Sequence, residues 1–162
     1  MSEVKKSRMK PRLGQLMAEK GGMYVVEALK RADAALEVLR EPSLTGIDGY
    51  IAALDGLVDS DLDDATRISA LYRRAGDIIS LSGAERNEAV ETAARSLCDL
   101  LDDAEVLTPS LLAGVKVHIA SIKLLHRAVA DPTVQGPILE GLAALVEKQQ
   151  RAAASEPKPP TE

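Results

Sequence analysis

Apolar residues recur every three or four positions along most of this 162-residue chain, and this period constrains its fold more than any other feature. Between Tyr24 and Arg40 the repeating positions are Val25, Leu29, Ala32, Leu36 and Leu39. That spacing places apolar side chains on one face of an α-helix. Because no stretch alternates apolar and polar residues over the length of a strand, the pattern predicts an all-α fold, a compact antiparallel bundle of five to six helices.

Composition agrees with a helical fold and excludes several classes of protein. Alanine and leucine supply 24 and 22 residues and favour helices, whereas Phe and Trp are absent. The apolar content of 46% is too high for a mainly disordered chain. No apolar run approaches the roughly 18 residues of a membrane span, and no secretory segment follows Met1. Because Cys98 is the single cysteine, no internal disulfide can form, and we expect a cytoplasmic protein without membrane insertion.

Proline and capping residues predict the helix boundaries in the first half of the chain. Because the residue before a proline disfavours the helical conformation, Glu41-Pro42 should end the first helix, and a second should cover Ser43–Val58. Asp61 is positioned to cap a third helix. Ser82 and Glu85 have the spacing of a capping box and should begin the fourth.

The boundaries in the second half depend on three proline dipeptides. Thr108-Pro109 predicts the start of a fifth helix, because a capping hydroxyl precedes a proline at the first helical position. This helix should run to about Ala130, and since it is apolar on more than one side we expect the others to surround it. Asp131-Pro132 and Gly136-Pro137 should bracket a turn before a sixth helix that begins near Ile138.

The two ends of the chain differ from its helical part. Residues 1–22 contain six basic and two acidic residues, so they carry a charge of +4, against −9 for the rest of the chain. Pro11 and three glycines interrupt this segment, which we interpret as a basic, flexible, mostly extended arm. We expect the helical bundle domain to cover residues 23–154, and residues 155–162, with three prolines, to form a disordered tail.

The chain lacks the residue patterns that common active sites need. No phosphate-binding glycine loop, nucleophile elbow or HExxH zinc pattern occurs in the sequence. Asp59, Asp61 and Asp63 alternate as in a calcium loop, but the central glycine is missing, so a capped helix start explains them better. Cys98 lies near an apolar helix face and fits a small buried hydrophobe. We therefore expect no catalytic residue, no metal and no cofactor.

Two histidines on the fifth helix raise the alternative of histidine phosphotransfer. His118 lies on the apolar stripe of that helix and His126 at its edge, so we interpret both as core or boundary residues. A phosphoacceptor has to face solvent, and histidine phosphotransfer domains carry the pattern His-x-x-Lys-Gly. Neither histidine has Lys-Gly at that spacing, and the alternative is a degenerate phosphoacceptor at one of these two positions.

A basic stripe on the fifth helix is one candidate surface for binding a protein. It consists of Lys116, Lys123 and Arg127, which lie on the side opposite the apolar stripe. It either docks an acidic partner or is a solvated face that pairs with acidic neighbours such as Asp99, Asp102 and Asp103.

The arm is the second candidate surface. Leu13, Leu16 and Met17, with Arg12 and Gly14 beside them, fit a short linear motif that docks on a protein while the positive charges orient it. Positive charge also attracts nucleic acid, but the rest of the chain is acidic and has no aromatic residues suited to stacking on bases. We therefore expect a protein partner and no nucleic acid.

Two parts of the sequence resemble a known family. The first contains Arg12-Leu13-Gly14-Gln15-Leu16, Gly21-Gly22 and Val26-Glu27-Ala28-Leu29, and the second runs from Val117 to Leu125. They resemble the beginning and the closing core helix of the alphaproteobacterial chemotaxis accessory protein CheE, with a similarity that covers Arg12 to about Val129. The resemblance implies a small, cytoplasmic, all-helical protein that acts with chemotaxis or two-component signalling components. It implies no catalytic residues.

These features together lead us to expect a non-enzymatic adaptor or modulator in bacterial chemotaxis or two-component signalling. It would bind a response regulator or another chemotaxis component through the arm and a face of the bundle. Two alternatives stay open: a degenerate histidine phosphotransfer protein that uses His118 or His126, and a purely structural helical bundle. The sequence patterns do not predict an oligomeric state.

Overall fold

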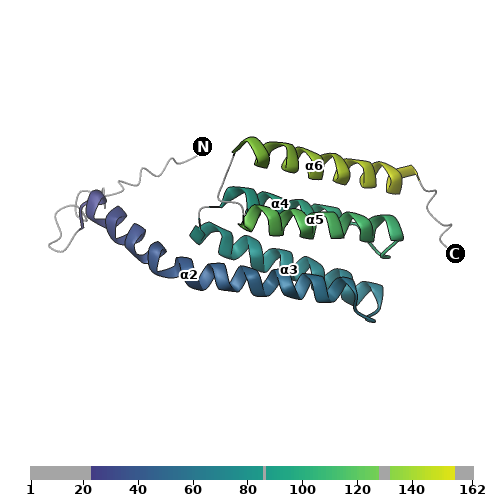
Figure 1. The fold of residues 1–162 in the computed structure, drawn as a ribbon, viewed down its shortest axis with the longest axis horizontal. Helices are drawn as coiled ribbons and strands as arrows, with labels where there is room; N and C mark the ends of the chain where they lie inside the picture. The colour runs from purple at the N-terminus through teal and green to yellow at the C-terminus, as the bar shows by residue number, and fades with distance from the viewer. Residues whose placement is uncertain (1–22, 86, 128–131, 156–162) are drawn as a thin grey trace, which may run out of the picture. The chain divides into compact units, whose positions relative to one another are not determined.

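The computed structural model describes residues 23–85, 87–127 and 132–155. Within these ranges the chain forms no strand and five helices, α2 (Val25–Val58), α3 (Asp64–Glu85), α4 (Glu88–Leu101), α5 (Pro109–Arg127) and α6 (Pro132–Ser155) (Figure 1). The predicted all-α fold is therefore confirmed. The predicted arm, residues 1–22, and residues 156–162 of the predicted tail lie outside the described residues.

The chain divides into two units, Met1–Ala35 and Leu36–Glu162, and the second contains the helical bundle. In this unit α4 contacts α3, α5 and α6, and α5 also contacts α6. Figure 1 shows α4 and α5 between α3 and α6. Contacts between Asn87 and Leu125 and between Ser96 and His118 show that α4 and α5 run antiparallel.

The core is built from the apolar stripe of each helix. On α4, half of the fourteen residues are buried. All five helices contribute large, fully buried apolar side chains, namely Ile47, Leu54, Leu71, Ile78, Val90, Leu97, Leu101, Val115, Ile122, Leu125 and Leu142. These positions follow the spacing of three and four residues, so the sequence pattern identified the side of each helix that faces the core.

The helix α2 continues through Pro42, so the predicted break at Glu41-Pro42 is wrong. A proline inside a helix lacks the N–H that would bond to the carbonyl four residues earlier, which here belongs to Val38. Val38 and Pro42 are both exposed, so water can hydrogen-bond that carbonyl. Beyond the proline, Ser43 and Ile47 are buried, and their packing keeps this part of the chain helical.

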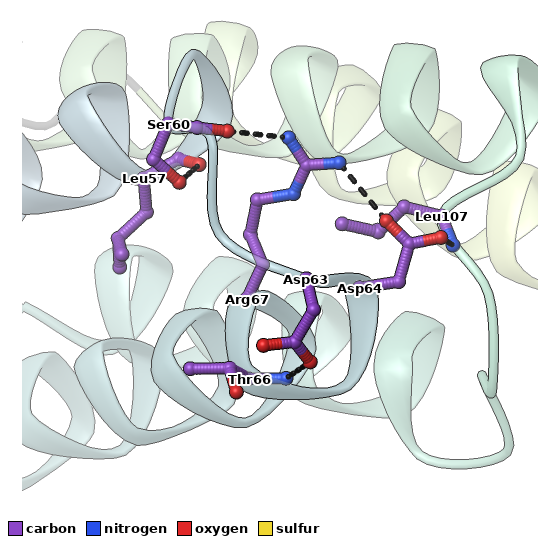
Figure 2. Close-up of polar contacts among 7 residues, drawn as sticks. All are labelled: Leu57, Ser60, Asp63, Asp64, Thr66, Arg67 and Leu107. Atoms are coloured by element: carbon purple, nitrogen blue, oxygen red, sulfur yellow. Dashed lines mark hydrogen bonds and ion pairs between the residues drawn. The ribbon is translucent and has the colours of Figure 1, made fainter.

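The cap of α3 is Asp63, and the prediction of Asp61 is wrong. The Asp63 carboxylate accepts a hydrogen bond from the Thr66 amide at 3.0 Å (Figure 2), which lowers the pKa of this carboxyl. Arg67 in the first turn donates to the Ser60 carbonyl at 3.0 Å. That bond ties the preceding loop to the helix and fixes where the helix begins, whereas Asp61 is an exposed loop residue.

The boundary between α3 and α4 also differs from the prediction. Because α3 extends to Glu85, Ser82 lies inside α3 and does not begin α4. The Ser82 hydroxyl is buried and donates to the Ile78 carbonyl at 2.8 Å, a bond that serines inside helices commonly form. The cap of α4 is Asn87, whose side-chain oxygen accepts from the Val90 amide at 3.2 Å.

The start of α5 is as predicted, but its surroundings are not. The Thr108 hydroxyl accepts from the Leu111 amide at 3.2 Å, and Pro109 is the first helical residue. The expectation that other helices surround α5 is wrong, because Val117 and Leu124 are 46% and 51% exposed. One side of α5 therefore faces solvent.

The predicted turn between Asp131-Pro132 and Gly136-Pro137 is wrong, because α6 begins at Pro132 and includes Pro137. Pro137 lies early in the helix and is exposed, so its missing N–H removes one hydrogen bond without burying an unpaired carbonyl. Leu142 and Val146 are buried and hold α6 on the bundle. None of the described helices is long and apolar enough to cross a membrane.

Candidate functional site

His118 is fully buried in the core. Its Nδ1 lies 2.8 Å from the carbonyl oxygen of Gly114, and its Nε2 lies 3.0 Å from the hydroxyl oxygen of Ser96 on α4. Because a carbonyl only accepts, Nδ1 carries the proton and Nε2 accepts from the Ser96 hydroxyl. Burial lowers the pKa of His118, against a smaller opposite effect of the bond to Gly114. His118 is a neutral core residue, as expected, and both ring nitrogens are engaged.

His126 lies at the edge of the core, also as expected. Its side chain is 5% exposed, and its Nε2 is 3.4 Å from a carboxylate oxygen of Asp48 on α2. The Asp48 side chain is mostly exposed, so the contact lies at the surface, above the buried ring. This contact joins α5 to α2.

Two residues of the predicted basic stripe are paired with aspartates at the C-terminal end of α2 and just after it. Lys116 Nζ lies 3.9 Å from an Asp59 oxygen, and Lys123 Nζ lies 2.5 Å from an Asp55 oxygen. The acidic neighbours of these two lysines are therefore Asp55 near the end of α2 and Asp59 just after it, and the suggestion of Asp99, Asp102 and Asp103 is wrong. These side chains are all substantially exposed, so the pairs contribute little to stability.

An open groove between α2 and α5 runs beside these ion pairs. Val58, Ile119 and Ala120 form its apolar part, and Lys116 and Lys123 with their aspartates form its charged part. Because each lysine already has an aspartate beside it, an acidic partner would have to displace that aspartate. The side chain of Arg127, the third residue of the stripe, lies outside the described part of the structure.

Cys98 is half-buried on α4, where its Sγ lies 3.9 Å from the Tyr72 carbonyl oxygen. Burial raises the pKa of the Cys98 thiol, and the nearby Asp99 and Asp102 raise it further, against a smaller opposite effect of Arg95. The thiol is therefore protonated near neutral pH and a weak nucleophile. Among the described residues, no three His, Cys, Asp or Glu side chains are grouped so that they could hold a metal ion.

The first half of α2 carries several large apolar side chains that are exposed in the described part of the chain. Of the thirteen exposed large apolar residues in the described part of the chain, seven lie between Met23 and Leu39. Val25 is 74% exposed and Leu29 is 60% exposed. Sequence reasoning assigned this segment to the bundle, because periodicity marks an apolar face but does not indicate what covers it. We refer to this surface as the α2 apolar face, defined by Val25, Leu29, Ala32, Leu36 and Leu39.

The residues predicted to dock on a partner precede α2 in the sequence. They lie outside the described residues and are Arg12, Leu13, Gly14, Leu16 and Met17. If they bind as the sequence predicts, the binding segment continues along the chain into the α2 apolar face.

No family model, curated protein or solved structure matches this chain. Its function is therefore inferred from the arrangement of its own residues and from the sequence resemblance described above.

Proposed function

We propose that this protein is a non-enzymatic adaptor or modulator that acts by binding other proteins. The observation that carries the proposal is the exposure of the α2 apolar face. Burial of apolar surface is favourable, and a helix gains most of its stability from packing its apolar side against another element. Amphipathic helices with such a face commonly bind protein partners through residues spaced three and four apart.

The proposed setting is bacterial chemotaxis or two-component signalling in the cytoplasm. Its support is the resemblance of the segments around Arg12–Leu16 and Val117–Leu125 to CheE. The proposed partner is a response regulator or another chemotaxis component, and the arm motif before α2 would contribute to the contact. The proposal includes no nucleic acid, cofactor or membrane insertion.

Histidine phosphotransfer is the weaker candidate function. His118 is fully buried with both ring nitrogens in hydrogen-bond contact, and the His126 side chain is 5% exposed. Phosphoryl transfer requires a ring nitrogen that a donor can approach. The burial of both histidines therefore argues against histidine phosphotransfer. Incubating the protein with a radiolabelled phosphorylated response regulator should leave it unlabelled, and stable label on either histidine would overturn the proposal.

Affinity purification of the tagged full chain from its native bacterium tests the proposal. The wild type should capture a response regulator or another chemotaxis component, identified by mass spectrometry. Leu29→Glu/Leu39→Glu should reduce that capture by about tenfold or more, because charge at the centre of an apolar interface is strongly unfavourable. Val38→Glu is the matched control, because Val38 is 75% exposed but lies off the α2 apolar face. The proposal would be contradicted if the wild type and both variants captured a signalling protein equally well, or if none of the three captured one.

A further inference from the structure

A groove with an apolar floor lies between α3 and the C-terminal end of α4. It is open to solvent, and its volume of about 480 Å³ is within the range of ligand-binding pockets. Both charged residues that line it are acidic. We refer to it as the α3–α4 groove, defined by Ile68, Tyr72, Leu101, Asp102, Ala104 and Glu105.

One hydrogen bond holds the loop after α4 beside α3. The Asp64 carboxylate, in the first turn of α3, accepts from the Leu107 amide at 3.0 Å. Ala104 and Glu105 belong to the loop that this bond fixes, whereas Ile68 and Leu101 belong to the core. The groove is therefore formed before any ligand binds, which reduces the entropic cost of binding.

The two carboxylates of the α3–α4 groove lack a basic partner. Asp102 and Glu105 form no hydrogen bond or ion pair within the described part of the chain. Residues 99–105 contain two more acidic residues, Asp99 and Asp103, and no basic one. In the groove between α2 and α5, by contrast, each lysine has an aspartate beside it. The α3–α4 groove therefore carries negative charge that nothing near it in the sequence balances.

This negative charge is unfavourable for the fold itself. Asp102 is the C-cap of α4, and the last turn of α4 contains no basic residue. Because the C-terminal end of a helix carries partial negative charge, it repels a carboxylate and favours a cation. Charges that oppose folding without a compensating contact are typical of functional sites. A positively charged ligand would relieve this repulsion.

We propose that the α3–α4 groove binds an arginine side chain of another protein, presented on a basic segment that also carries apolar residues. The aliphatic part of the arginine would cover the apolar floor, and its guanidinium group would donate hydrogen bonds to Asp102 and Glu105. This inference goes beyond the proposed function and does not rest on it, because it concerns a different surface from the α2 apolar face and the arm.

Tyr72 favours arginine over lysine. Its side chain lines the groove and is 44% exposed. A planar guanidinium group stacks on an aromatic ring and can bond to a carboxylate through two N–H groups at once. The ammonium group of lysine is a compact, strongly hydrated charge that gains less from such a site.

The surroundings of the groove favour a protein segment over a small cation. Because the groove is open, it does not enclose a small molecule. Val106, directly after Glu105, is 59% exposed, and Leu62, three residues before Ala65, is 44% exposed. A peptide can cover this apolar surface while its arginine occupies the groove. Arginine next to apolar contacts is common at the centre of protein interfaces.

Titration of the full chain with a synthetic peptide tests the site. The probe is an acetylated and amidated peptide that repeats Ala-Arg-Leu three times, and in the control peptide citrulline, a neutral analogue of the same shape, replaces arginine. We expect a dissociation constant between about 10 µM and about 1 mM for the arginine peptide, with NMR shifts of the Ser69, Leu101 and Ala104 amides. The citrulline peptide should bind about tenfold or more weakly. Equal binding of the two peptides, or no binding of either, would overturn the inference.

Two pairs of substitutions distinguish a specific site from general negative charge. Asp102→Asn/Glu105→Gln removes the carboxylates of the groove and should weaken binding of the arginine peptide about tenfold or more. Asp99→Asn/Asp103→Asn is the matched control, because it removes the same charge from exposed neighbours that do not line the groove. It should weaken binding less than about threefold at about 0.15 M salt, which screens distant charges. Equal losses in the two variants would overturn the inference.

Tyr72→Leu tests the choice of arginine. The wild type should bind the arginine peptide about threefold or more tightly than the same peptide with lysine. Tyr72→Leu keeps an apolar side chain but removes the ring, so it should bind the two peptides nearly alike. A wild type that prefers lysine would refute the assignment of arginine.

Thermal unfolding shows whether the carboxylates serve the fold. Because Asp102 and Glu105 are exposed and repel the end of α4, Asp102→Asn/Glu105→Gln should melt at the wild-type temperature or about 1–3 °C above it. Its loss of binding then cannot come from unfolding. A clearly lower melting temperature would show that these carboxylates stabilise the fold and would contradict the inference.

Sedimentation of the full chain tests the source of the basic segment. The wild type and Asp102→Asn/Glu105→Gln should sediment alike, because the ligand belongs to another protein. Dimers of the wild type that this variant abolishes would identify the basic arm of a second copy as the ligand and would overturn the proposal of a different protein.

Discussion

Asp64 and Leu107 are 43 residues apart in the sequence, yet an Asp64 carboxylate oxygen accepts a hydrogen bond from the Leu107 amide at 3.0 Å (Figure 2). The other carboxylate oxygen accepts from Arg67 at 3.1 Å, and Arg67 also donates to the Ser60 carbonyl at 3.0 Å. Asp64 and Arg67, both in the first turn of α3, therefore together connect the loop before α3 with the loop before α5.

Replacing Asp64 should loosen both loops. In Asp64→Ala the Leu107 amide loses its acceptor at a partly buried position, so the free energy of unfolding should fall by about 1–3 kcal/mol. Asp61→Ala, at an exposed position of the loop before α3, is the matched control and should change the free energy of unfolding by less than about 0.5 kcal/mol. Chemical denaturation of the two variants provides the comparison, and equal losses would show that the Leu107 contact has no special role.

Asp63 should act as a helix cap and not as a calcium ligand. Asp63→Ala should lower the melting temperature by about 2–4 °C, the shift expected for the loss of one cap in a chain of this length. Because the Thr66 amide lowers the pKa of Asp63, its stabilising effect should be lost as the pH falls below the ordinary value of 3.8. Calcium should leave the melting temperature of the wild type unchanged, and a calcium-dependent rise would refute this assignment.

The apolar period predicted the fold class and the buried face of each helix well, because burial of that face is the main driving force of folding. It placed His118 in the core correctly from its alignment with Val115 and Ile122. Local signals were less reliable at helix ends. They predict boundaries at Pro42 and Ser82, but both residues lie inside helices: buried neighbours of Pro42 pack on the core, and the Ser82 hydroxyl bonds to a helix carbonyl.

The candidate site was less predictable than the fold, because the sequence marks an apolar face without specifying its neighbours. Val25 and Leu29 have the same four-residue spacing as Ile47 and Ile51, yet the first two are exposed and the last two are buried. The ion pairs of Lys116 and Lys123 also depend on which helix lies beside α5, and no local pattern contains that information.

His118 should be required for stability rather than for phosphoryl chemistry. His118→Ala leaves a space in the core and removes the contacts to Ser96 and Gly114, so the free energy of unfolding should fall by about 1–3 kcal/mol. Signalling in the native bacterium should fall only as far as the amount of folded protein does. A variant of unchanged stability that has lost all partner signalling would instead indicate phosphoryl transfer.

The burial of His118 also predicts a pH dependence. Its pKa in the folded protein is below the ordinary 6.5, so the unfolded chain binds a proton more readily as the pH falls through 6.5. Stability should therefore decrease between about pH 7.5 and pH 5. His118→Gln removes this titration, and its loss of stability over the same range should be smaller than that of the wild type. His126→Gln is the control, and a parallel decline in all three proteins would rule out His118 as the cause.

Two glycines should respond in opposite ways to alanine. A Cβ at Gly49 on α2 would meet open space, so Gly49→Ala should stabilise the helix by about 0.5–1 kcal/mol. A Cβ at Gly114 on α5 would lie 3.0 Å from a Leu145 methyl group and 3.2 Å from a Leu100 methyl group. Gly114→Ala should therefore destabilise the protein by about 1–3 kcal/mol, because the packed side chains of Leu100 and Leu145 would have to shift to admit the methyl group. Urea denaturation of both variants measures whether the free energy of unfolding rises in Gly49→Ala and falls in Gly114→Ala.

The arm should be dispensable for folding but required for binding. In the described part of the chain every buried residue lies between Ser43 and Val146, so deleting residues 1–22 should leave helicity and melting temperature nearly unchanged. The same deletion should strongly weaken binding to the signalling partner, because it removes the arm motif. A deletion that unfolds the bundle would show that the arm belongs to the fold.

Within the arm, the apolar residues should matter more than the charges. Leu13 and Leu16 would be desolvated in the complex and would slow dissociation, whereas Lys5, Lys6 and Lys10 would mainly accelerate encounter and lose influence as salt rises. We therefore expect Leu13→Ala/Leu16→Ala to weaken binding about tenfold or more at both low and moderate salt. The triple variant Lys5→Ala/Lys6→Ala/Lys10→Ala should weaken binding mainly at low salt, through slower association. The reverse result, with loss only in the lysine variant, would make the arm an electrostatic tether to an anionic surface and would refute its role as a protein-docking motif.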